Sequence, residues 1–241
     1  MRFQSWVISD KGLKREGNQD SFLVDERLGL FIVADGVGGH QGGEVASALA
    51  VETVREVVGH PKAHRFTPKE VLYQAYEEAS HRIFDRATQE LRLSGMGTTM
   101  VMGYVRDTKL FIANVGDSRA YLYRKPYVWQ VTEDHSLINE QIRLGLLTEE
   151  QAYKTVGKNV ITRSVGFERD VFPDVIEREV SSGDVFLFCS DGLTGMVADT
   201  LMSQIFNQTA IEKVTAKMID SALENGGDDN VTVLVLQFLD V

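Results

Sequence analysis

Five aspartates stand where an apolar segment of the chain meets a turn. Asp35, Asp117 and Asp191 each close an apolar run, while Asp20 and Asp229 each come just before one. Any one of them could simply shape a turn, because Asp and Asp-Gly favour tight turns and helix starts. If the ends of these runs meet in the fold, however, the carboxylates repel one another unless a cation neutralises them. Hard divalent cations prefer oxygen ligands, so the pattern predicts an acidic cluster that holds two or more Mg²⁺ or Mn²⁺ ions.

The stretch FIVADGVGGH, residues 31–40, brings three glycines and a histidine directly after the first of these acids. Gly36 has no side chain, so its backbone carbonyl could approach a metal ion closely. Gly38 and Gly39 allow turn conformations that are closed to other residues and would place His40 near the acids. A phosphate-binding glycine loop is a weaker interpretation, because the P-loop lysine and the dinucleotide-binding spacing are both missing.

Composition places the chain among ordinary globular proteins. Its 241 residues are 43% hydrophobic, with no export signal and no apolar run long enough to span a membrane. The net charge of -10 argues against nonspecific binding of nucleic acid, which needs a basic surface. Cys189 is the only cysteine, which excludes an internal disulfide and favours a reducing cytoplasm; its strand pattern indicates a buried small hydrophobe rather than a nucleophile. We therefore expect one cytoplasmic domain over residues 1–241, without a membrane or nucleic-acid partner.

The elements that must position these residues alternate between strand and helix patterns. In chain order, the patterns are strands within 5–35, helices at 42–58 and 67–84, strands within 98–131 and at 184–191, two helices through Gly226 and a strand at 230–238. The second helix begins with a capping box of Thr67 and Glu70. Residues 136–178 are less regular, with short helical stretches at SLINEQIRLG and TEEQAY. This order predicts an α+β fold in which sheets pack together and helices lie outside them.

Seven motifs occur in order along the chain, and together they resemble one enzyme family. They are LKREGNQDSF, FIVADGVGGHQGGEVAS, GMGTT, IANVGDSRAYL, TEDHS, LFCSDGL and GGDDNVTV. From about residue 5 to residue 238, the chain is similar to the metal-dependent serine/threonine phosphatases of type 2C in their compact bacterial form. The resemblance implies a four-layer sandwich, in which two central antiparallel β-sheets are flanked by pairs of helices and a metal centre lies where the sheets meet.

The resemblance also implies the ligands of a centre of two Mn²⁺ or Mg²⁺ ions. Asp35 would bridge both ions, and Gly36 would offer its carbonyl to one of them. Asp191 and Asp229 would complete the shell of the first ion. Asp20 would act mainly through bound water.

Further site positions follow from the same resemblance. Asp117 would help to hold a third, weaker ion, Arg15 would bind the substrate phosphate, and His40 would lie near the leaving group. Asn230 would support the metal shell, and Gln19 stands where other members have Glu, an exchange expected to weaken one water-mediated contact to a metal. By residue type alone, His40 is equally compatible with capping the following helix, and Arg15 with a solvated turn.

The expected reaction is hydrolysis of phosphoserine and phosphothreonine in proteins. Two ions about 4 Å apart can lower the pKa of a bridging water, so that a metal-bridging hydroxide attacks phosphorus directly and no phosphoenzyme forms. Arg15 would orient the phosphate through a planar bidentate fork. His40 titrates near neutrality and would protonate the leaving alkoxide, which is typically worth about 10²- to 10⁴-fold in rate.

The expected partners follow from this reaction. We expect phosphorylated proteins as substrates, a serine/threonine kinase as the opposing enzyme, signal transduction as the setting and a monomer as the functional unit. Two alternatives are a phosphatase dedicated to one regulatory protein and a degenerate module that binds phosphoproteins without catalysis. The second alternative predicts the loss of some acids or of Arg15, all of which are present. The irregular segment 136–178 matches a variable flap beside the site and is expected to influence the choice of protein substrate.

Overall fold

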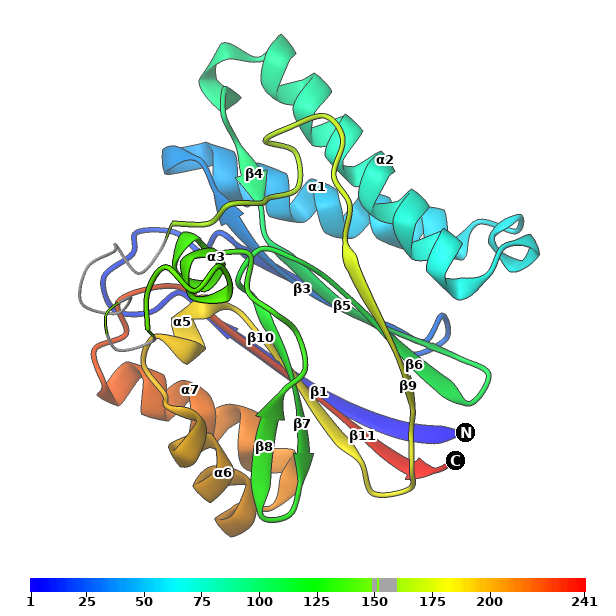
Figure 1. Ribbon diagram of the computed structural model, residues 1–241, viewed down its shortest axis with the longest axis vertical. Coiled ribbons are helices and arrows are strands. Elements are labelled where there is room, and N and C mark those ends of the chain that lie inside the picture. Colours follow the sequence, from blue (N-terminus) through cyan, green and yellow to red (C-terminus); the bar gives the residue numbers. More distant parts are fainter. Residues whose placement is uncertain (149–150, 152–159) are drawn as a thin grey trace.

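The computed structural model describes residues 1–148, 151 and 160–241, and for residues 39–41 it describes the backbone alone. Two antiparallel β-sheets lie face to face, and helices cover the outer face of each (Figure 1). The first sheet has the strand order β1-β11-β10-β7-β8. The second has the order β2-β3-β5-β6-β9, with β4 paired to β3. This arrangement confirms the predicted α+β four-layer sandwich.

The strands follow the apolar runs of the sequence. Their bounds are β1 Arg2–Asp10, β2 Asp20–Asp25, β3 Leu30–Val37, β4 Gly97–Thr98, β5 Met100–Arg106, β6 Lys109–Val115, β7 Arg119–Arg124, β8 Tyr127–Gln130, β9 Asp174–Glu179, β10 Val185–Cys189 and β11 Val231–Asp240. The central strands are apolar on both faces, because one face meets the other sheet and the opposite face meets helices. For this reason every side chain from Leu30 to Ala34 is fully buried.

The helices cover the outer faces in pairs. Their bounds are α1 Gly39–Gly59, α2 Pro68–Gln89, α3 Leu137–Arg143, α5 Asp191–Thr194, α6 Asp199–Gln208 and α7 Val214–Glu224. α1 and α2 pack on the second sheet, and α6 and α7 pack on the first (Figure 1). The predicted capping box begins α2: the Thr67 hydroxyl accepts a hydrogen bond from the Glu70 N–H, and the Glu70 carboxylate accepts one from the Thr67 N–H. α5 was not predicted, because four residues are too few to show a helical period.

Three apolar layers hold the sandwich together. One lies between the α1–α2 pair and the second sheet, one between the α6–α7 pair and the first sheet, and one between the two sheets. The layer between the sheets contains Phe31, Phe188 and Phe238, and the ring of Phe186 meets that of Phe238 edge-on at 5.9 Å. Because the sheets pack directly on each other, the ends of their strands meet at the edges of this layer.

The segment predicted as a flap, residues 136–178, contains several kinds of structure. α3 opens it, and residues 160–173 run beside α2 without a helix or a named strand. Ser80 of α2 fastens this stretch, because its hydroxyl donates to the Glu168 carbonyl oxygen at 2.8 Å and accepts from the Gly166 N–H at 2.9 Å. β9 begins at Asp174, so the last five residues of the range pair with β6 at the edge of the second sheet. The predicted helical stretch TEEQAY lies mostly outside the described residues.

Among the described helices, none combines the length and the apolar character that a membrane span would need.

Candidate metal centre

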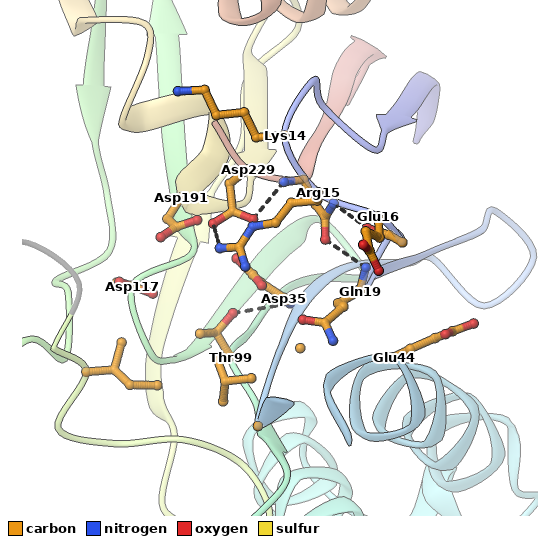
Figure 2. Close-up of a pocket in the computed structure, with 16 residues that line it drawn as sticks. Lys14, Arg15, Glu16, Gln19, Asp35, Glu44, Thr99, Asp117, Asp191 and Asp229 are labelled. Atoms are coloured by element: carbon orange, nitrogen blue, oxygen red, sulfur yellow. Dashed lines mark hydrogen bonds and ion pairs between the residues drawn. The ribbon is translucent and has the colours of Figure 1, made fainter. Parts of the chain in front are cut away.

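Four of the predicted acids gather in one cavity at an edge of the two-sheet layer. The cavity has a volume of about 510 Å³, and Figure 2 shows Arg15, Asp35, Asp191 and Asp229 around the same space. The charged and polar side chains that line it are Lys14, Arg15, Glu16, Gln19, Asp35, Glu44, Thr99, Asp117, Asp191, Asp229 and Asn230. These residues come from strand ends and turns of both sheets, from the β1–β2 connection and from helices α1 and α5, so only the packed sandwich brings them together.

Strand register explains this convergence. In the β2–β3 pair, Asp20 lies directly opposite Asp35. In the antiparallel β10–β11 pair, the strand end that precedes Asp191 is next to the strand end that follows Asp229. The close approach of these ends needs a glycine, because a Cβ on Gly192 would lie 2.0 Å from a backbone carbonyl oxygen of the chain that leads into β11.

Asp20 lies behind the cavity rather than on its wall. One carboxylate oxygen accepts hydrogen bonds from the Ser190 hydroxyl at 2.8 Å and from the Thr232 hydroxyl at 2.6 Å. The other oxygen is buried and has no partner among the described residues. Burial raises the pKa of Asp20 to about 7, against the lowering effect of the two hydroxyls. A buried carboxylate oxygen of this kind needs a water molecule, a proton or a cation beside it.

The carboxyl groups on the cavity wall are crowded and poorly solvated. Burial raises the pKa of Asp35 well above its usual range, and the charges of Asp20 and Asp191 raise it further. Burial likewise raises the pKa of Asp117 to about 7 and raises that of Asp191, one of whose oxygens is buried without a described partner. The folded chain therefore disfavours these negative charges unless protons or cations neutralise them. An all-oxygen set of donors fits Mn²⁺ or Mg²⁺.

The spacing of the acids bears on how ions could be held. Within the described residues, one group of three candidate ligands has all its ligand atoms within 4.8 Å of one another, and this group is Glu77, His81 and Asp170, outside the cavity. No three of the described cavity acids meet this limit, although Asp35 and Asp191 are close enough to share a hydrogen bond. An ion there would share few protein oxygens at once and complete its shell with water, as Mg²⁺ commonly does.

Arg15 brings positive charge to this acidic wall. Its Nη2 donates to Asp229 Oδ2 at 2.6 Å, and the two side chains are 52% and 27% exposed. This hydrogen bond is the largest cause of the raised pKa of Arg15. An ion pair with this exposure contributes about 1 kcal/mol or less to stability, so Arg15 can exchange Asp229 for another anion with little loss.

Asn230 ties the loop that carries Arg15 to the start of β11. Its side-chain oxygen accepts a hydrogen bond from the Gln19 N–H at 2.8 Å. Its amide nitrogen donates to the carbonyl oxygens of Lys11 at 2.8 Å and Gly17 at 2.9 Å. Asn230 is buried, and Gln19 lies on the cavity wall. Both residues therefore stand beside the acids, where the resemblance places them.

Gly36 has a packing role that the sequence did not reveal. A Cβ at Gly36 would lie 2.0 Å from the Gly43 carbonyl oxygen, because the first turns of α1 press against the end of β3. Gly36 also lines the cavity, as the prediction of a carbonyl ligand requires. His40 lies in the first turn of α1, but its side chain is outside the described residues, so its role stays a prediction.

Hydroxyl groups surround the acids. Thr99 Oγ1 lies 2.7 Å from the Ser118 hydroxyl and accepts a hydrogen bond from the Asp35 N–H at 3.3 Å. Thr232, buried in β11, donates to Asp20 and was not predicted as a site residue. A threonine in an otherwise aliphatic strand, as in NVTVLVL, is the signal that could have found it, because a buried hydroxyl needs a partner.

Comparisons with known proteins identify the family. Residues 14–233 match the family model described as protein phosphatase 2C, so the chain belongs to the protein phosphatase 2C family. Among its relatives is the serine/threonine phosphatase stp of Listeria monocytogenes, which is 38% identical over 237 residues. That alignment covers 95% of this chain and 93% of the relative.

Solved structures agree with this assignment. The crystal structure of the Mycobacterium tuberculosis serine/threonine phosphatase PstP/Ppp matches with a TM-score of 0.90 at 31% identity, covering 98% of this chain and 99% of that chain. The catalytic domain of PstP in complex with 2 manganese ions matches with a TM-score of 0.87 at 31% identity, covering 99% of each chain. The prediction of a metal-dependent serine/threonine phosphatase with this fold is thereby confirmed.

Proposed function

We propose that this chain hydrolyses phosphoserine and phosphothreonine in proteins at a centre of two Mn²⁺ or Mg²⁺ ions, with a third ion held more weakly. One observation carries the proposal: Asp35, Asp117 and Asp191, whose pKa values are all raised, crowd around a cavity that also contains Arg15. The serine/threonine phosphatase relatives, one of them solved with 2 manganese ions, support it.

The proposed ligands divide by their place around the cavity. Asp35, Asp191 and Asp229 would bind the two ions together with the carbonyl of Gly36. Asp20 would act through water, because its carboxylate lies behind the wall with one oxygen free. Bound ions would supply an activated water for single-step attack on phosphorus and would offset the negative charge of the phosphate.

Arg15 would exchange partners when substrate and metal bind. In the structure its guanidinium neutralises Asp229. A cation on Asp229 would compete with this pair and release the guanidinium toward the cavity. Arg15 could then bind two phosphate oxygens through parallel N–H···O bonds, a geometry that a lysine cannot reproduce.

The direct test is release of phosphate from phosphopeptides with and without divalent ions. Mn²⁺ or Mg²⁺ should be required, and Asp191→Ala should abolish hydrolysis by removing a shared ligand. Asp220→Ala is the matched control, because Asp220 is an exposed acid on α7 that does not line the cavity. Full activity in protein freed of metal by a chelator would refute the proposal.

His40 would protonate the leaving serine or threonine alkoxide. His40→Ala should then slow hydrolysis of a phosphoserine peptide by about 10²-fold or more, the usual contribution of a general acid. Hydrolysis of p-nitrophenyl phosphate should fall much less, because its leaving group needs little protonation. Equal losses with both substrates would assign His40 to the structure of the α1 N-terminus instead.

The peptide around the phosphorylated residue would lie against the segment 160–173. A second cavity of about 760 Å³ adjoins the first, and Val37, Gly38 and Ile161 line both. Phe167 and Phe172 on its wall are 63% and 74% exposed, so they offer apolar contact to a substrate chain. Phe172→Ala should raise KM for protein substrates and leave that for p-nitrophenyl phosphate unchanged. An unchanged ranking across a panel of phosphoproteins would contradict this role of the flap.

The cellular setting is part of the same proposal. The protein would act as a monomer in cytoplasmic signal transduction and oppose a serine/threonine kinase. A phosphoprotein panel tests its breadth: strong activity on one protein with p-nitrophenyl phosphate ignored would identify a dedicated phosphatase. Light scattering in solution tests the monomer, and a dimer mass would contradict it.

A further inference from the structure

His135 connects separate parts of the fold beside the metal cavity. It belongs to the segment TEDHS between β8 and α3 and is 8% exposed. The ring atom Nδ1 accepts a hydrogen bond from the Gly116 N–H at 3.0 Å. The backbone N–H of His135 donates to the Gly116 carbonyl oxygen at 2.9 Å. An N–H group can only donate, so Nδ1 carries no proton and the proton of the neutral ring lies on Nε2. Nε2 faces Asp174 Oδ2 at 3.2 Å.

The contact with Gly116 bears directly on Asp117. Gly116 has φ of +101° in the turn between β6 and β7, and a Cβ there would lie 2.5 Å from Thr99 Cβ. The N–H that His135 binds belongs to the peptide group before Gly116, and the carbonyl belongs to the peptide group after it. The second of these groups leads into Asp117, so its orientation determines where that side chain points.

The opposite side of His135 reaches the other wall of the cavity. Its carbonyl oxygen accepts from the Thr162 N–H at 2.8 Å, next to Ile161 on the cavity wall. Asp174, the partner of Nε2, also accepts from Arg163 Nη1 at 3.0 Å. The ring and the backbone carbonyl of His135 together join it to two segments that are distant in the sequence, the turn at Gly116 and residues 162–174.

We propose that His135 is a positioning residue: it holds the Gly116–Asp117 turn so that the Asp117 carboxylate faces the metal cavity, and it ties this turn to residues 160–174. The link to metal binding rests on the proposed function, in which Asp117 helps to hold the weaker ion. The hydrogen bonds between His135 and Gly116 do not depend on that function. Burial lowers the pKa of His135, which agrees with the neutral ring that this geometry requires.

Two amide substitutions separate the roles of the ring nitrogens. His135→Asn places an amide oxygen near the position of Nδ1, so the Gly116 N–H keeps an acceptor, whereas His135→Gln reaches toward the position of Nε2. A structural role without positioning predicts the same result for both variants. His64→Asn is the matched control, because His64 is an exposed histidine whose ring makes no hydrogen bond within the described residues.

The first measurement is hydrogen exchange of the Gly116 amide by NMR in protein treated with a chelator, which needs neither metal nor activity. Loss of one hydrogen bond, at about 1.4 kcal/mol, corresponds to exchange about 10-fold faster. We expect this acceleration in His135→Gln, and exchange within about threefold of the wild type in His135→Asn. Equal exchange rates in the two variants would overturn the proposal. If the Gln variant does not fold, fast exchange in the folded Asn variant overturns it and slow exchange supports it.

The second measurement is Mn²⁺ binding by calorimetry. His135→Gln should weaken the weaker class of sites about 10-fold and leave the tighter class within about twofold, while His135→Asn should recover both. Asp117→Asn gives the reference for loss of the weaker site. Weakening of both classes alike would overturn positioning through Asp117. If the wild type binds no Mn²⁺ and Gly116 exchange still behaves as expected, the hold on Gly116 stands and the proposed function fails.

Discussion

The metal-free protein should lose stability as the pH rises from 5 to 8. The pKa of Asp20 is about 7 in the folded chain, against 3.8 for an ordinary aspartate, because the carboxyl group is buried. A raised folded pKa stabilises the fold fully below the unfolded value, and this stabilisation is lost as the pH rises through the folded value. Between pH 5 and 7, at about 1.4 kcal/mol per unit, Asp20 alone accounts for roughly 3 kcal/mol. The raised pKa of Asp117 acts in the same direction.

Urea unfolding in a chelating buffer at several pH values tests this dependence. The comparison is with Asp20→Asn. This variant removes the titrating group, and its amide oxygen can still accept hydrogen bonds from the hydroxyls of Ser190 and Thr232. The free energy of unfolding of the wild type, relative to this variant, should fall by roughly 3 kcal/mol from pH 5 to 8. His135 has a lowered pKa and acts in the opposite direction, but it is common to both proteins and cancels in the difference.

Metal should reverse the trend. Mn²⁺ binds the ionised acids and therefore should restore stability most strongly at pH 8, where fewer protons neutralise the cluster than at pH 5. A difference between wild type and Asp20→Asn that is constant or grows with pH would refute the reasoning.

Three further predictions concern single contacts. Gly36→Ala should weaken Mn²⁺ binding in calorimetry, because a Cβ 2.0 Å from a carbonyl oxygen of α1 must displace that helix; unchanged affinity would contradict this. Tyr76→Phe should lower the free energy of unfolding in urea by about 1–3 kcal/mol, since its buried hydroxyl bonds the carbonyl oxygens of Met100 at 2.7 Å and Ala113 at 3.0 Å. Thr67→Ala should cost about 1 kcal/mol in the same assay by removing the cap of α2, and no change would count against the capping box.

Local patterns in the sequence were sufficient for the elements and for the chemistry of the site. The run FIVAD predicts a buried strand that ends at Asp35, because a charge is far better placed at the end of a buried strand than within it. The capping box of Thr67 and Glu70 marked the start of α2 correctly. Five acids at strand boundaries indicated metal chemistry, and four of them line the cavity.

Only the tertiary structure decided which of these boundaries meet. Asp20 of β2 and Thr232 of β11 are 212 positions apart and belong to different sheets, yet they share a hydrogen bond because the two sheets pack face to face. The position of Asp20 behind the wall, the pairing of Arg15 with Asp229 and the hold of His135 on its distant turn all arise from such long-range contacts. An alternating pattern determines which face of a strand is buried, since burial follows the side-chain period of two. It carries no information about which strand lies alongside, because many apolar strands present equivalent faces until the whole sandwich packs.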